Sequence, residues 1–80
     1  MRKLQGNIRA TRYAPENMVN RPLAGKGLIS YRYVQPHGYI MIGAKDVLDA
    51  RNEAQRSLTA GVARMEQLQV WNGQEYVAVK

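Results

Sequence analysis

Residues 46–61 carry the helix signal of this chain, and it limits what the rest can build. Asp46 can cap the free N–H groups of a first helical turn, and Asp49 follows three residues later, as in a capping box. The apolar residues recur at helical spacing and form one narrow stripe: Val47, Ala50, Ala54 and Leu58. Gly61 stands where a left-handed cap would end the helix. One helix with so narrow a stripe needs another apolar layer to pack against.

That layer is predicted directly before the helix, in two β-prone runs at 28–34 and 39–44. The four residues between them, Gln35-Pro36-His37-Gly38, have turn chemistry, because proline presets φ and glycine accepts a positive φ. The pattern therefore predicts a β-hairpin followed by a helix over residues 28–61.

The two faces of the second run are predicted to differ. Ile40 and Ile42 are expected to face the helix stripe, whereas Tyr39 and Met41 point the other way and should be partly exposed. Gly43 indicates either a bulge or a close approach of the helix.

A second hairpin is predicted near the C-terminus, where Asn72-Gly73 separates the runs 65–71 and 74–80. Asn-Gly favours a two-residue type I′ turn, because that turn needs φ > 0 at both positions. The pairs expected across the strands are Trp71–Gln74, Gln69–Tyr76 and Leu68–Val77. The side chains expected to be buried are Leu68, Val70, Val77 and Val79.

The predicted fold class is therefore α+β: a small antiparallel sheet of four to five strands with one helix packed on one face, in the order (β)ββαββ. We expect a single domain over residues 1–80. It consists of a basic arm or edge strand plus loop at 1–27, the hairpin and helix at 28–61, and a C-terminal hairpin at 62–80. A chain of this length buries only roughly 60% of its unfolded surface, so the core should be modest.

Positive charge is concentrated at the start of the chain. The sequence has 12 Lys/Arg against 6 Asp/Glu, for a net charge of +6. Residues 1–27 carry six basic side chains and one acidic one, a net +5, and residues 28–80 carry six and five, a net +1. Such a segment attracts nucleic acid by counterion release, and it also suits an acidic protein partner or simple solubility. Its basic residues are Arg2, Lys3, Arg9, Arg12, Arg21 and Lys26.

The aromatic residues are five tyrosines and one tryptophan, with no phenylalanine. Tyr31-Arg32-Tyr33 interleaves aromatic and basic side chains, as proteins that stack single-stranded bases on a sheet do. Alternatively, these tyrosines only stabilise a small sheet by cross-strand contacts. A third prediction assigns Trp71 and Tyr76, with Tyr39, to an aromatic face that binds a protein.

Catalysis is not expected. The chain has no cysteine and a single histidine, His37, which lies in a predicted turn. This set is too small for a metal site or a nucleophile–base pair, and capping accounts for Asp46 and Asp49. We therefore predict a non-enzyme without cofactor or metal. The longest apolar run falls far short of the ~20 residues that span a bilayer, which predicts no membrane contact and a cytoplasmic location.

The hairpin and helix region also resembles known groups of proteins. Residues 46–54 follow the pattern DxxDAxxEA, and the strand–turn–strand–capped helix over 28–61 resembles short phage and prophage accessory proteins. It is also similar to the amino-terminal arm-binding domains of tyrosine recombinases, from which the tail hairpin at 68–79 departs. The phage resemblance implies either DNA-linked work or inhibition of a host or defence protein. The sequence thus leaves DNA or RNA, an acidic protein, and a homodimer formed through strand edges as predicted partners.

Overall fold

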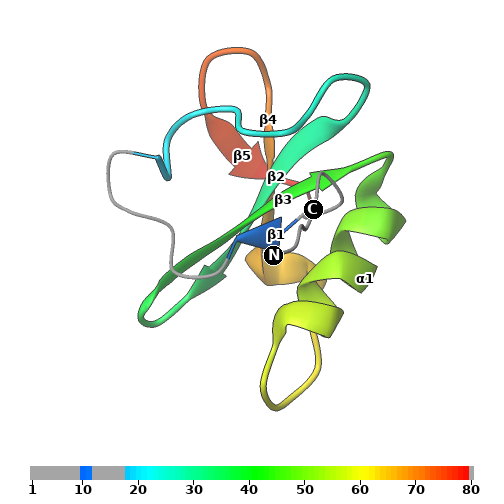
Figure 1. Cartoon of the computed structure of the whole chain (residues 1–80). Helices are drawn as coiled ribbons and strands as arrows, with labels where there is room; N and C mark the ends of the chain where they lie inside the picture. Colours follow the sequence, from blue (N-terminus) through cyan, green and yellow to red (C-terminus); the bar gives the residue numbers. More distant parts are fainter. Residues whose placement is uncertain (1–9, 12–17, 80) are drawn as a thin grey trace, which may run out of the picture.

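The computed structural model describes residues 10–11 and 18–79, and it has the predicted α+β fold (Figure 1). One helix, α1 (Val47–Ser57), packs on an antiparallel sheet with the strand order β1-β3-β2-β4-β5. The strands are β1 (Ala10–Thr11), β2 (Ile29–Gln35), β3 (Gly38–Ala44), β4 (Leu68–Trp71) and β5 (Tyr76–Ala78), with a short 3₁₀ helix η1 (Met65–Gln67) before β4. The predicted order of strands and helix is therefore confirmed.

The first hairpin is the predicted one. Strands β2 and β3 pair in a register that runs from Ile29–Ala44 to Gln35–Gly38. Pro36 and His37 are left as a two-residue turn, as their turn chemistry indicated. This register places Tyr31 opposite Ile42 on one face of the sheet.

The start of α1 is also as predicted. The Asp46 side chain caps the helix and accepts a hydrogen bond from the Asp49 backbone N–H at 2.8 Å. The Asp49 carboxylate in turn accepts from the backbone N–H of Lys45 at 3.0 Å, one residue before the cap. The two aspartates together satisfy N–H groups that would otherwise be free in the first turn, and both lie at the positive end of the helix.

The end of α1 differs from the prediction. The C-cap is Leu58 in an extended conformation, and its N–H bonds to the carbonyls of Ala54 and Gln55. Gly61 does adopt a positive φ of 86°, but it lies three residues further on, where its carbonyl accepts from the Gln55 side chain at 3.1 Å. The predicted glycine cap is wrong because Leu58 packs on the core and turns the chain away from the helix first.

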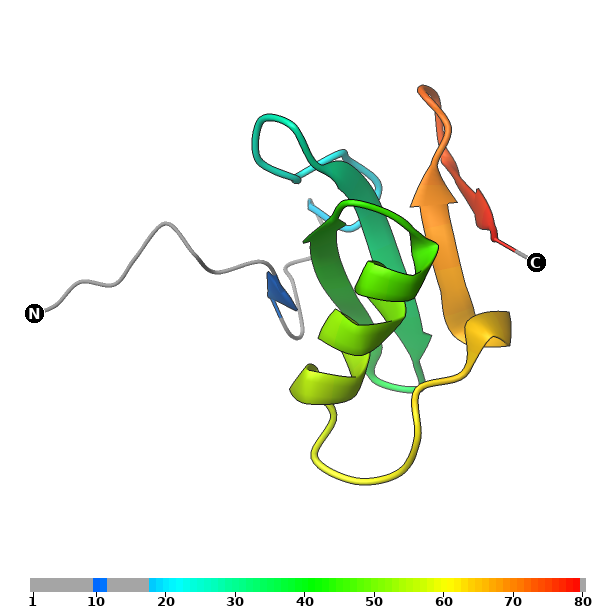
Figure 2. The same cartoon turned by 90° about the vertical axis from the view of Figure 1, so that its right-hand side faces the viewer.

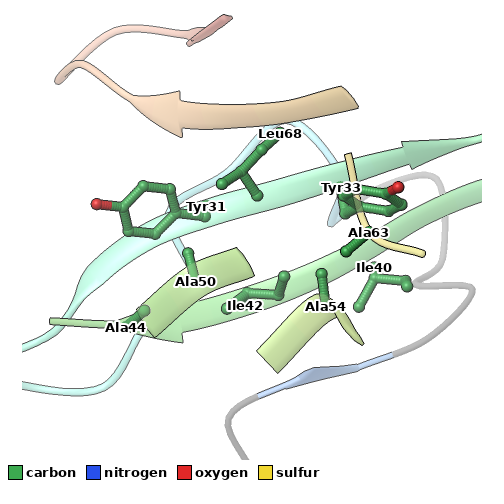
Figure 3. Packing of buried hydrophobic residues seen from close by; sticks show 9 residues of the cluster. All are labelled: Tyr31, Tyr33, Ile40, Ile42, Ala44, Ala50, Ala54, Ala63 and Leu68. Carbon is green, nitrogen blue, oxygen red and sulfur yellow. The ribbon is translucent and has the colours of Figure 1, made fainter. Parts of the chain in front are cut away.

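The main core lies between α1 and the sheet (Figure 3). The stripe residues Ala50 and Ala54 are fully buried, and their small side chains allow the helix to pack close to β3. Val47 and Leu58 pack at the two ends of the stripe, as predicted. The buried residues of this core are Tyr31, Tyr33, Ile40, Ile42, Ala44, Ala50, Ala54, Ala63 and Leu68.

A chain segment covers the opposite face of the sheet: residues 18–28, here called the strap (Figures 1 and 2). Val19 and Leu23 of the strap pack against Met41 and Tyr76 of the sheet in a second, smaller apolar cluster. Met41 is consequently only 3% exposed, so the prediction of partial exposure is wrong for this residue. The prediction of partial exposure is correct for Tyr39, which is half-buried at the edge of the same cluster.

Gly43 marks a close approach of two segments, but the strap makes it and not the helix. A Cβ atom at this position would lie 3.2 Å from the Cβ of Ala24 and 3.2 Å from Cδ1 of Leu28. The alternation of side chains across β3 explains this, because residue 43 faces the same side as Met41.

The second hairpin has a different register from the predicted one. Trp71 lies opposite Tyr76 and Val70 opposite Val77, so the pairing is shifted by two residues. The Asn72 side-chain oxygen accepts from the backbone N–H groups of Gln74 at 2.8 Å and Glu75 at 2.9 Å, which makes the loop longer than a type I′ turn. A shift of two keeps each residue on its face, so Leu68 is buried as predicted. Val70 and Val79 pack against the core, but they and Val77 are only half-buried, which corrects the prediction for the three valines.

The start of the chain contributes one short edge strand. Ala10 pairs with Ile42 and Thr11 with Met41, so the alternative of an edge strand holds for these two residues. The basic residues of this segment that were predicted to contact nucleic acid, Arg2, Lys3, Arg9 and Arg12, lie outside the described residues.

Within residues 18–79, no helix combines the length and the apolar character needed to cross a membrane.

Candidate functional site

The strap face of the sheet carries a row of one cation and three aromatic rings. The guanidinium carbon of Arg32 lies 4.4 Å from the ring centroid of Tyr39 and 4.6 Å from that of Tyr76. Trp71 meets Tyr76 edge to face, with centroids 5.2 Å apart and an interplanar angle of 67°. We call these four residues, in the order Tyr39, Arg32, Tyr76 and Trp71, the stack. Its two ends, Tyr39 and Trp71, are only half-buried.

The register of the sheet assembles the stack from strands far apart in the sequence. Arg32 of β2 lies opposite Met41 of β3 on one side and Gln69 of β4 on the other. Side chains alternate along a strand, so Tyr39 and Trp71, two positions from these partners, share the face of Arg32. Tyr76 joins them because β5 pairs with β4.

The Arg32 guanidinium is held by three hydrogen bonds in addition to the rings. Its Nε donates to the Gln69 side-chain oxygen at 2.5 Å. Its Nη1 donates to the Val19 carbonyl and to the Asn20 side-chain oxygen, both at 2.8 Å. Within the described part of the chain, these partners are all neutral. The contacts within the described residues therefore hold a half-buried positive charge in a fixed position.

The same stack holds the strap on the sheet. Besides the Arg32 bonds, the Tyr76 hydroxyl donates to the Arg21 carbonyl at 2.6 Å. The buried Ser30 hydroxyl accepts from the Ala24 backbone N–H at 2.9 Å. The strap backbone is thus fixed along its length by side chains of β2 and β5, because a loop over a sheet face must find such partners for its polar groups.

Two buried tyrosines have a raised pKa. Burial raises the pKa of Tyr76 above its ordinary value of 10.0, and the nearby Arg32 charge and Ser30 hydroxyl act in the opposite direction. Burial also raises the pKa of Tyr31 from 10.0, and the carboxylates of Asp46 and Asp49 raise it further.

We expect these tyrosines to make the fold sensitive to alkali. Because the folded state holds both phenol protons more tightly than the unfolded chain does, their stabilisation is complete below about pH 10 and is lost as pH rises through the raised pKa values. Urea unfolding should therefore give a constant free energy in neutral buffer and a falling one above about pH 10. Tyr76→Phe should make that alkaline fall less steep. An unchanged slope in Tyr76→Phe would show that Tyr76 does not contribute.

Exposed positive charge flanks the stack on the strap, where Arg21 and Lys26 are both solvent-exposed. On the helix side, Arg56 pairs with Glu53, and Arg64 lies 3.9 Å from Glu66. The strap face therefore combines half-exposed rings with positive charge.

The structure separates the predicted nucleic-acid residues. Arg32 is in the stack and Arg21 and Lys26 are beside it, but Tyr31 and Tyr33 are 2% and 3% exposed beneath α1. The prediction that these two tyrosines touch bases is corrected, since alternation along β2 places them on the opposite face from Arg32. The Tyr33 hydroxyl instead accepts from the backbone N–H of Arg64 at 2.9 Å.

The predicted protein-binding residues do lie together. Tyr39, Tyr76 and Trp71 all belong to the stack, although Tyr76 is 7% exposed because the strap covers it. Sequence reasoning placed Gln69 opposite Tyr76 in the second hairpin, but it did not identify Gln69 or Asn20 as partners of Arg32. No local signal connected Asn20 with β2.

Metal-ligating side chains are not clustered in the described residues. Within them, no group of three or more His, Cys, Asp or Glu side chains could hold a metal ion. His37 is exposed in the first hairpin turn. Comparisons with protein-family models, curated proteins and solved structures gave no match to the chain.

Proposed function

We propose that this is a cytoplasmic, non-enzymatic protein that binds single-stranded nucleic acid on the strap face. The observation that supports this most is the charge of Arg32, which is fixed between two rings and bonded to neutral partners. Such a cation attracts phosphate, and it stands next to ring surfaces on which bases can stack.

The proposal assigns different roles to the residues of this face. Arg21 and Lys26 neutralise phosphates, together with the basic residues that precede the strap, Arg2, Lys3, Arg9 and Arg12. Tyr39 and Trp71 offer the half-exposed rings for bases, while Arg32 and Tyr76 hold those rings in place. Phosphate contacts give affinity without sequence readout, so we expect little sequence preference.

Charge reversal on the strap tests this assignment. We expect Arg21→Glu/Lys26→Glu to weaken binding of a fluorescent single-stranded oligonucleotide at least about tenfold and to reduce the salt slope by about 1.4, the value for two lost phosphate contacts. The measurement is fluorescence anisotropy over a series of salt concentrations. The matched control is Lys45→Glu/Arg64→Glu, which changes the net charge equally but alters two exposed residues next to the helix.

Equal losses in the two double variants would mean that only net charge matters and that the strap face is not the site. No binding of the wild-type protein even at low salt would contradict the proposal altogether, because a protein with a net charge of +6 should then bind most tightly.

A second candidate function uses the same face. The half-exposed Trp71, packed on Tyr76, is the kind of aromatic anchor that dominates protein interfaces. With Tyr39 it would bind a protein through apolar and aromatic contacts, as an inhibitor of a host or defence protein would. Trp71→Ala should then abolish capture of the partner, and binding should depend little on salt. A steep salt dependence would favour nucleic acid instead.

A further inference from the structure

Arg32 fixes the orientation of two neutral amide side chains on the strap face. Its Nε donates to Oε1 of Gln69 at 2.5 Å, and its Nη1 donates to Oδ1 of Asn20 at 2.8 Å. A guanidinium has donors and no acceptor, so each amide must turn its oxygen toward Arg32. The NH₂ groups of Asn20 and Gln69 are therefore directed away from it.

The guanidinium also keeps one nitrogen for an outside ligand. Within the described residues, no acceptor binds Nη2 of Arg32, Nε2 of Gln69 or Nδ2 of Asn20. All three nitrogens reach solvent: Asn20 is exposed, and the one unpartnered side-chain atom that is buried in the described part of the chain is Oε1 of Gln35. Because Nη2 is next to both Nε and Nη1 in the planar guanidinium, the two amides flank it.

We infer that Arg32, Asn20 and Gln69 form a phosphate subsite, which the backbone of single-stranded nucleic acid fills. Each of the three unbound nitrogens is an NH₂ group that donates only. The phosphodiester is the acceptor-only part of a nucleic acid and is oppositely charged to Arg32, whereas every base also carries a donor. The inference rests on the proposed function, and it adds two neutral residues and a fixed position for a phosphate.

The subsite is largely organised before a ligand arrives. The rings of Tyr39 and Tyr76 hold the guanidinium, with centroids 4.4 Å and 4.6 Å from its central carbon. A donor group that is already ordered loses little conformational freedom on binding, and hydrogen bonds from a charged donor to phosphate oxygens are strong. The half-exposed ring of Tyr39 lies beside the subsite, where the base that adjoins the phosphate can stack.

The test replaces each amide by the carboxylate of the same shape, in Asn20→Asp and Gln69→Glu. A carboxylate still accepts from Arg32, so the fold should be kept, but it has no N–H to donate and it cancels the guanidinium charge. Fluorescence anisotropy with a labelled oligothymidylate of about 12 nucleotides measures binding. We expect each variant to raise the Kd at least about tenfold and to reduce the salt slope by about 0.7, the value for one lost phosphate contact.

The matched control is Asn52→Asp, the same substitution at an exposed residue of α1. It changes the net charge equally and should alter the Kd less than about twofold. Urea unfolding checks that all three variants are folded.

An abasic strand of equal length carries the same phosphates without bases, and it separates the two kinds of recognition. Asn20→Asp and Gln69→Glu should weaken binding of both strands by the same factor. A loss with the oligothymidylate alone would overturn the inference, because the amides would then contact bases. Losses no larger than that of Asn52→Asp would also overturn it, and with a wild-type protein that binds they would leave the proposed function standing. A wild-type protein that binds neither strand would contradict the proposed function and the subsite with it.

Discussion

Replacing Leu68 with alanine is expected to lower the free energy of unfolding by about 3 kcal/mol. Leu68 is 1% exposed and packs in the core between the sheet and α1, where its loss leaves a cavity (Figure 3). A chain of this size has a total stability of only about 4–12 kcal/mol, so the variant should unfold at a much lower urea concentration. Urea unfolding followed by circular dichroism measures the change.

The matched control is Leu48→Ala, the same truncation at a helix residue that is 63% exposed. It should change the free energy of unfolding by less than about 0.5 kcal/mol, since the side chain is already in water and alanine favours helix. Similar losses in the two variants would contradict the placement of the core between α1 and β4.

Replacing Arg32 with alanine is expected to cost about 2 kcal/mol, a large effect for a residue on a sheet face. The substitution removes two cation–ring contacts and three hydrogen bonds of a charged group, and it leaves the Val19 carbonyl and the Gln69 side chain without their partner. Arg56→Ala is the control, because its side chain is 65% exposed and its ion pair with Glu53 should contribute only a few tenths of a kcal/mol.

Arg32→Ala should also loosen the strap specifically. Amide hydrogen exchange should speed up in residues 18–24 more than in α1, since Arg32 binds the Val19 carbonyl and the Asn20 side chain. If Arg32→Ala costs no more than Arg56→Ala, or if exchange in the strap does not change, the stack does not hold the strap in place.

The parts of the fold that the sequence predicted depend on short-range chemistry. The Asp46 cap, the alanine stripe and the Pro36 turn all act within a few residues, so local rules could locate the helix and the first hairpin. In the second hairpin, two local rules favour turns of different length. Asn-Gly favours a two-residue turn, but the Asn72 side chain bonds to two backbone N–H groups and sets a longer loop.

The candidate site depends on contacts across long stretches of chain, and the sequence predicted only part of it. Tyr31-Arg32-Tyr33 looked like one cluster because the residues are adjacent, yet a strand sends neighbours to opposite faces. The rings that do contact Arg32 come from β3 and β5, and their position follows from the register. The strap could not be foreseen, because nothing local to Val19 or Leu23 indicates which face they cover.

A titration of ¹⁵N-labelled protein with a short single-stranded oligonucleotide, followed by NMR, locates the surface that binds nucleic acid. We predict that the largest shifts fall on the Trp71 indole N–H, the Arg32 Nε–H and the strap amides, with little change in α1. Shifts confined to α1, or none at low salt, would contradict binding on the strap face.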